Sequence, residues 1–164
     1  MSLLKPRQPL NTNYLQTTKY QVSLSFAGDA VYFCQDVNLP GVELGSAVQA
    51  TPGIDLFNPG TKLSYNPFRM TFIVNENISS WKTIYDWMNQ MSNNQDGTTK
   101  RYREKQMGTL TILSNLNNPK IRIKFSDIYP TSLGDIQFST TGSAEEIITA
   151  TAEFRYNYFE IENL

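Results

Sequence analysis

The stretch FRMTFIVNENISSWKTIYDWMNQM (68–91) decides the fold class, because its hydrophobic period changes halfway along. In FRMTFIV (68–74) apolar and polar residues alternate, which predicts a half-buried β-strand. The apolar residues then recur every three or four positions, which predicts one helix over about 78–91, capped by Asn77 or Ser79. Trp87 lies at the flank of its apolar face. We expect that face to pack on a sheet or on a neighbouring subunit, and its residues are Ile78, Trp81, Ile84 or Tyr85, Met88 and Met91.

Outside this stretch, the regular patterns are those of strands. The alternating segments are YQVSLSF (20–26), VYFC (31–34), GTLTIL (108–113), KIRIKF (120–125), IQF (136–138) and IITATAEFRYNYFEI (147–161). Gly28-Asp29 predicts a reversal that joins the first two into a hairpin, and Asn117–Pro119 predicts a turn between the next two. Because one helix cannot build an α-helical fold, we predict a mainly antiparallel β-barrel or two-sheet sandwich of seven or eight strands, flanked by that helix.

The segment 37–67 differs from the other strand regions because prolines and glycines divide its short apolar stretches. We predict a long hairpin that turns near Pro52-Gly53. Its small residues provide little material for a core of its own. It is therefore expected to project onto a neighbouring subunit, and its candidate contact residues are Val42, Leu44, Val48, Pro52, Gly53, Ile54 and Leu56.

The 164 residues suffice for one domain, which we place at 19–164. Residues 1–18 are predicted to form an N-terminal arm, because Pro6 and Pro9 discourage regular structure. The arm is either a frayed terminus or a segment that becomes ordered on a partner. The sequence offers neither an apolar run of about 18 residues nor the apolar core of a signal peptide. We therefore expect no membrane anchor and synthesis in a cytoplasm.

Composition excludes most catalytic chemistry. The chain has no histidine, one cysteine (Cys34) and a net charge of −1, which leaves no Ser-His-Asp or Cys-His machinery and no cysteine-based zinc site. The possible carboxylate pairs are Asp127 with Asp135 and Glu145 with Glu146; all lie in predicted loops and read as solvated charges. Phosphate-binding glycine loops are missing from the sequence. We therefore predict no enzymatic activity, no cofactor and no metal.

Two basic features remain. KRYREK (100–105) combines cations with a tyrosine, an arrangement that can grip single-stranded nucleic acid, but the net-acidic chain favours a solvated loop or a protein-contact patch. On the strand 120–125, Arg122 and Lys124 form a cationic face opposite the apolar one.

Four segments, in order, resemble the tail-tube proteins of contractile-tailed bacteriophages, which share a fold with the type VI secretion tube protein. They are YQVSLSFAGDAVYFCQDVNLPGVEL (20–44), the strand-helix run 68–91 with Asp86-Trp87, IYPTSLGDIQF (128–138) and ITATAEFRYNYFEI (148–161). The resemblance covers about residues 20–161, and the arm lies outside it.

The resemblance implies a structural virion protein. Its subunits would form hexameric rings that stack into the hollow inner tail tube, inside a sheath, and phage DNA would be ejected through the lumen. The implied partners are further copies of the chain and the sheath, baseplate and tape-measure proteins, with the virion tail as location after assembly in the host cytoplasm. The basic residues of 100–105 are then assigned to sheath contact: Lys100, Arg101, Arg103 and Lys105.

Other functions stay open. The chain is alternatively a baseplate or tail-terminator relative of the tube protein. A β domain that binds carbohydrate or nucleic acid is a second alternative, and a hydrolase with loop carboxylates is a third. For a tube, we expect polar strand faces to line the lumen, with Arg122 and Lys124 paired with acids or pointing elsewhere.

Overall fold

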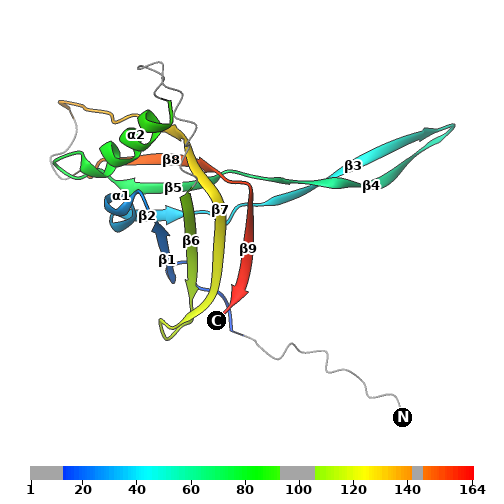
Figure 1. Ribbon diagram of the computed structural model, residues 1–164, viewed down its shortest axis with the longest axis horizontal. Coiled ribbons are helices and arrows are strands. Elements are labelled where there is room, and N and C mark those ends of the chain that lie inside the picture. Colours follow the sequence, from blue (N-terminus) through cyan, green and yellow to red (C-terminus); the bar gives the residue numbers. More distant parts are fainter. Residues whose placement is uncertain (1–12, 93–105, 142–145) are drawn as a thin grey trace, which may run out of the picture.

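The computed structural model describes residues 13–92, 106–141 and 146–164, and these form nine strands and two helices (Figure 1). The elements are β1 (Tyr20–Leu24), α1 (Gly28–Tyr32), β2 (Cys34–Val37), β3 (Val42–Thr51), β4 (Ile54–Tyr65), β5 (Phe68–Ile73), α2 (Ser79–Ser92), β6 (Gln106–Leu113), β7 (Pro119–Leu133), β8 (Thr149–Arg155) and β9 (Tyr158–Asn163). The prediction of a mainly antiparallel β protein with a flanking helix is confirmed.

The body of the molecule is one seven-stranded sheet that bends along β7. Its strand order is β1-β6-β7-β8-β5-β2, and β9 pairs with the first part of β7. The bend lies at Asp127, whose φ of 59° is tolerated by a short polar side chain. The second part of β7 then pairs with β8. Because the terminal strands β1 and β2 do not pair with each other, the body is a two-layered sandwich and not a closed barrel.

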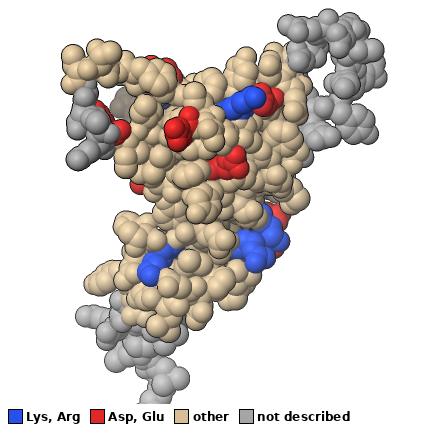
Figure 2. Space-filling model, turned by 90° about the vertical axis from the view of Figure 1, so that its left-hand side faces the viewer, with Lys and Arg blue, Asp and Glu red and all other residues tan. Residues whose placement is uncertain are grey.

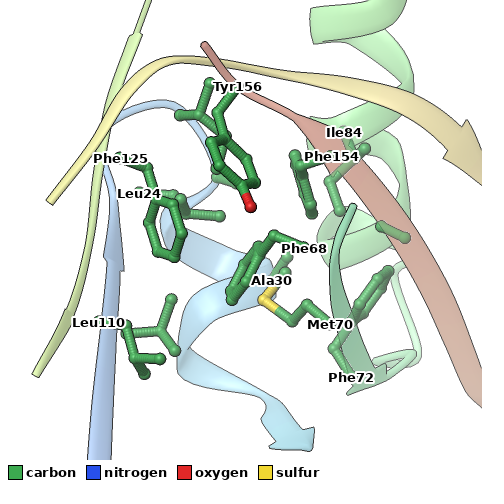
Figure 3. Packing of buried hydrophobic residues seen from close by; sticks show 14 of the residues in the cluster. Leu24, Ala30, Phe68, Met70, Phe72, Ile84, Leu110, Phe125, Phe154 and Tyr156 are labelled. Atoms are coloured by element: carbon green, nitrogen blue, oxygen red, sulfur yellow. The ribbon is translucent and has the colours of Figure 1, made fainter. Parts of the chain in front are cut away.

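Aromatic side chains fill the space between the two layers (Figure 3). Phe68 is fully buried, and its ring centroid lies 5.0 Å from that of Phe125 and 6.0 Å from that of Phe154. Tilted rings at such distances contribute about 0.5–1.5 kcal/mol per pair beyond the burial of area. Strands from both halves of the sheet thus meet in one continuous core.

The first predicted hairpin is wrong. β1 pairs with β6 and β2 pairs with β5, and Gly28–Tyr32 forms a helical turn where a reversal and the start of the strand 31–34 were expected. Ala27 and Ala30 are fully buried, so this turn fits closely against α2. Alternation in 20–26 correctly gives a half-buried strand, but it does not specify which strand is the partner.

The closing segment is also not one strand. It separates at Tyr156-Asn157 into β8 and β9, because Asn157 N–H donates to the carbonyl of Ser126 at the bend of β7 (3.0 Å). The chain thereby crosses from one half of the sheet to the other. The structure has nine strands where seven or eight were expected, and this division contributes one of them. The predicted strand IQF (136–138) has no regular structure, and its Phe138 is exposed.

Helix α2 lies where the sequence places it, but its buried face is rotated. Ile84 and Trp87 are buried, so the placement of Trp87 at the flank is wrong. Trp81, Met88 and Met91 are partly buried against the core, whereas Ile78 and Tyr85 are exposed in the single chain. The face turns because Trp87 packs against Phe26 and Phe154, with centroid distances of 5.6 and 6.0 Å.

The start of α2 uses a different cap from either expected one. The side-chain oxygen of Asn75 accepts a hydrogen bond from the backbone N–H of Ser80 (3.2 Å), and its amide donates to the Ser79 hydroxyl (2.7 Å). Asn77 is exposed. To bring Asn75 into this position, the chain passes through Ile78 with φ of 56°, a conformation that β-branched residues rarely adopt.

Candidate assembly surfaces

The most prominent surface feature is the β3–β4 hairpin, which projects far from the body (Figure 1). Its two strands pair only with each other and form a separate two-stranded sheet. Residue Thr51 lies opposite Ile54, so Pro52-Gly53 forms the turn, as predicted, with Gly53 at φ 96°. That φ favours glycine, since a Cβ there would be strained.

Apolar side chains of the hairpin face solvent. All seven residues that the sequence predicts as contacts are exposed: Val42, Leu44, Val48, Pro52, Gly53, Ile54 and Leu56. Two further apolar residues belong with them, Phe57 (72% exposed) and Leu63 (50%). Val48 lies opposite Phe57, and Leu44 lies opposite Leu63, so each pair shares one face. Exposed apolar surfaces of this kind are typical of sites that contact another molecule.

A close backbone approach interrupts the hairpin midway. The register shifts between Leu44 and Ser46, where β4 carries two more residues than β3. A Cβ added at Gly60 would lie 2.4 Å from the carbonyl oxygen of Gly45, a separation that backbone atoms cannot relieve without moving. Only glycine fits at this position.

The base of the hairpin is fixed to the body. Asn66 N–H donates to the Gly41 carbonyl (3.0 Å), and the Tyr156 hydroxyl donates to the carbonyl of Asn66 (2.8 Å). The Tyr65 ring packs on Tyr156 and Phe159, at centroid distances of 5.8 and 5.5 Å. Burial is the main cause that raises the pKa of Tyr156 to about 12, so this hydroxyl remains a donor across the neutral range.

A second surface is the polar face of β1, β6, β7 and β9. The register places two rows of side chains across these four strands: Gln21, Thr111, Arg122 and Glu162, and then Ser23, Thr109, Lys124 and Glu160. Lys124 Nζ lies 2.6 Å from Glu162 Oε1. The cationic face predicted for β7 is therefore balanced by carboxylates of β9. Cations gather toward the lower end of the molecule in Figure 2, and carboxylates lie mainly above them.

Helix α2 supplies a smaller surface. The Trp81 indole N–H donates to the carbonyl of Gly134 (2.9 Å), and the ring stacks on Tyr85 with a centroid distance of 5.4 Å. Tyr85 and Ile78, both predicted to pack, are free to contact another molecule from the exposed side of α2. The hydrogen bond holds Trp81 in place although its ring is only partly buried.

The basic residues Lys100, Arg101, Arg103 and Lys105 lie outside the described residues, as does most of the arm. In the described part of the arm, Tyr14 and Leu15 are 90% and 70% exposed.

The carboxylate Asp127, one of the pairs considered from the sequence, receives a hydrogen bond from the Asn157 amide. Across residues 13–92, 106–141 and 146–164, no group of three or more acidic or cysteine side chains is placed to hold a metal, and no helix is long and apolar enough to span a membrane.

Comparisons with known proteins give a consistent picture. A family model described as phage tail tube protein matches residues 7–162. The tail tube terminator protein of Enterobacteria phage T4 is 29% identical over 158 residues, which cover 92% of this chain and 90% of the relative.

Among solved structures, a chain of the anti-feeding prophage cap, a tube-terminating cap, superimposes with a TM-score of 0.65 at 16% identity, covering 99% of this chain and 100% of that one. A chain of the sheath–tube complex of the extracellular contractile injection system PVC gives 0.63 at 16% identity, over 93% and 94% of the two chains. These likenesses show the same fold.

Proposed function

The chain belongs to the phage tail tube protein family, and from this premise we propose that it forms rings at the end of a contractile tail tube, as the tube's terminator. Family membership makes it a structural component of a phage tail, located in the virion tail, and not an enzyme. The proposal adds the ring, its hexameric symmetry and its place in the tube. It includes assembly in the host cytoplasm before the tail is complete.

The hairpin is the observation that carries the ring-forming part of the proposal. In the part of the chain that the structure describes, Val48, Leu56 and Phe57 are exposed on a ribbon whose two strands pair only with each other. Burying apolar area contributes about 25 cal/mol per Å², so such a ribbon gains most by lying on another subunit. We assign it to contact with an adjacent subunit or ring, as the sequence led us to expect.

The relationship to the phage T4 tail tube terminator supports the position at the tube end. The identity of 29% extends over nearly the whole length of both chains. In this role one side of the ring contacts the last tube ring, and the other side forms the end of the tube.

A repeating tube subunit is the second candidate, and the match of the tube family model to residues 7–162 favours it. In both cases phage DNA passes through the lumen. The four-stranded polar face suits the lumen wall, because Lys124 is paired with Glu162 and Arg122 lies opposite Glu162 in the register, so that DNA is not held tightly.

The outer wall is proposed to meet the tail sheath through Lys100, Arg101, Arg103 and Lys105. Exposed charge pairs contribute only about 0–1 kcal/mol each, so such contacts re-form readily. Tape-measure and baseplate proteins are further proposed partners. Reversing all four charges should leave rings intact and weaken sheath assembly most at raised salt; normal sheathed tails from that variant would reject the assignment.

Negative-stain microscopy of the purified chain over a concentration series tests the proposal. A terminator gives discrete rings that do not lengthen, while a repeating subunit gives tubes that grow with concentration. A stable monomer that binds a sugar or an oligonucleotide would contradict both. Addition of a purified tube from the same phage sharpens the result, since a terminator should attach at the tube end only.

A further inference from the structure

An open cleft separates the two terminal strands of the body sheet. Among the strands that the structure describes, β1 pairs only with β6 and β2 pairs only with β5, so each presents an edge without a partner strand. The cleft between these edges has a volume of about 710 Å³. Residues from the end of the arm, from β1, α1 and β2 line it, among them Thr17, Thr18, Tyr20, Val31 and Cys34.

A side-chain hydrogen bond, and not a series of backbone hydrogen bonds, connects the two edges. The Tyr20 hydroxyl donates to the carbonyl oxygen of Gln35, and burial is the main cause that raises the pKa of Tyr20 to about 12. Directly paired strands lie about 4.8 Å apart, whereas here the Tyr20 side chain spans the distance from β1 to the backbone of β2. Backbone groups at such edges are a ready template for an added strand.

The N-terminal arm has the properties of that strand. It leaves the body at Thr17 and Thr18, which line the cleft. Residues 10–16 contain no proline and would extend over roughly 23 Å at the rise of a β-strand. Within it, Tyr14 and Leu15 carry large side chains that are exposed among the described residues.

Residues 13–16 do not line the cleft of their own chain. The chain turns at Thr17-Thr18 before it enters β1, and Lys19 N–H donates to the Gln16 carbonyl there (3.4 Å). We propose that residues 10–16 of one copy occupy the β1–β2 cleft of a second copy as an added strand. This inference rests on the proposed ring assembly, which brings several clefts and arms together.

The only cysteine of the chain makes the proposal testable, because Cys34 lines the cleft and is partly buried. A cysteine is introduced at one arm position at a time, Tyr14→Cys, Leu15→Cys and Gln16→Cys, because neighbouring strand residues point to opposite faces. Full-length rings are oxidised at about pH 9, since burial raises the pKa of the Cys34 thiol and the thiolate is the reactive form.

Two controls separate contact from chance collision. Leu116→Cys places a thiol on the β6–β7 turn, where Leu116 is 82% exposed, compared with 70% for Leu15. Cys34→Ser combined with Leu15→Cys removes the acceptor. We expect interchain disulfides from at least one arm variant at about tenfold or more the yield of Leu116→Cys, because a bound arm raises the effective thiol concentration toward millimolar.

Each outcome decides the question. Rings that form without interchain disulfides, or that give only intrachain ones, overturn this inference and leave the ring assembly standing. Disulfides that persist after Cys34→Ser overturn it as well. A chain that stays monomeric in the microscope at every concentration overturns both the inference and the proposed function.

Discussion

Two phenylalanines show how differently the body and the hairpin treat the same residue type. Phe68 and Phe57 both lie on antiparallel strands, yet Phe68 is fully buried and Phe57 is 72% exposed. Strands β7 and β8 bring Phe125 and Phe154 onto Phe68. The ribbon β3–β4 has no layer to face. The residues of a strand therefore do not tell whether the chain itself covers its apolar side chains.

The hairpin keeps its form by other means. An isolated two-stranded hairpin is only marginally stable in water. Here the Tyr65 aromatic contacts and the Gly41–Asn66 hydrogen bond fix its base. The body thus depends on its core, while the hairpin depends on its attachment and, in our proposal, on a second subunit.

The largest expected effect comes from removing the outer hairpin. Replacing residues 46–59 by an Asn-Gly turn should abolish ring stacking, or attachment to a tube end, because the exposed apolar ribbon is gone. The melting temperature of the subunit should stay nearly unchanged, since these residues pair only with each other. Normal assembly of this variant in negative stain would show that the hairpin is not the contact element.

The phenylalanine pair gives a direct test of the comparison. Phe68→Ala should lower the free energy of unfolding by about 3–5 kcal/mol, because it leaves a cavity in the core. Phe57→Ala should change it by no more than about 0.5 kcal/mol, as exposed positions do, and should instead weaken assembly. Urea denaturation of both variants measures the difference; equal losses would mean that the hairpin folds onto the body.

A substitution at the middle of the hairpin should lower stability by an amount between the losses expected for Phe68→Ala and Phe57→Ala. Gly60→Ala places a methyl group against the backbone of Gly45, and such overpacking costs about 1–3 kcal/mol. The cost should appear as faster amide hydrogen exchange in residues 42–65, with body amides unaffected. The matched control is Gly28→Ala, where an added Cβ meets nothing within 4 Å. Similar exchange in the two variants would argue against the close approach.

The smallest effect concerns the body alone. Ile78→Asn should stabilise the subunit by about 1 kcal/mol, because asparagine tolerates positive φ better than a β-branched residue. The reverse exchange, Asn117→Ile at φ 61°, should cost at least as much, since it also removes the hydrogen bond from Lys19 Nζ (2.6 Å). Thermal unfolding compares the two. A loss of stability on Ile78→Asn would mean that the Ile78 side chain packs more than its exposure indicates.

Much of the assembly surface follows from the sequence. Proline and glycine spacing locates the hairpin and its turn, and a two-residue turn at Pro52-Gly53 already places Phe57 opposite Val48, so a register count identifies Phe57. The same count does not place Leu63 opposite Leu44, because the two additional residues of β4 beside Gly45 shift the register. The cleft between β1 and β2 gives no sequence signal at all, since it exists only where two distant strands fail to meet.

By itself, the sequence determines the class of each element: strands where apolar residues alternate, the helix α2 where the period changes, and a ribbon that lacks core residues. It does so because local periodicity reflects which side of an element meets apolar surroundings. Only the tertiary structure decides which strands pair and how β7 contributes to both halves of the sheet. It also decides that Trp87 is more fully buried than Trp81. Those outcomes depend on contacts between residues far apart in the chain, where volume and shape select among partners with equal periodicity.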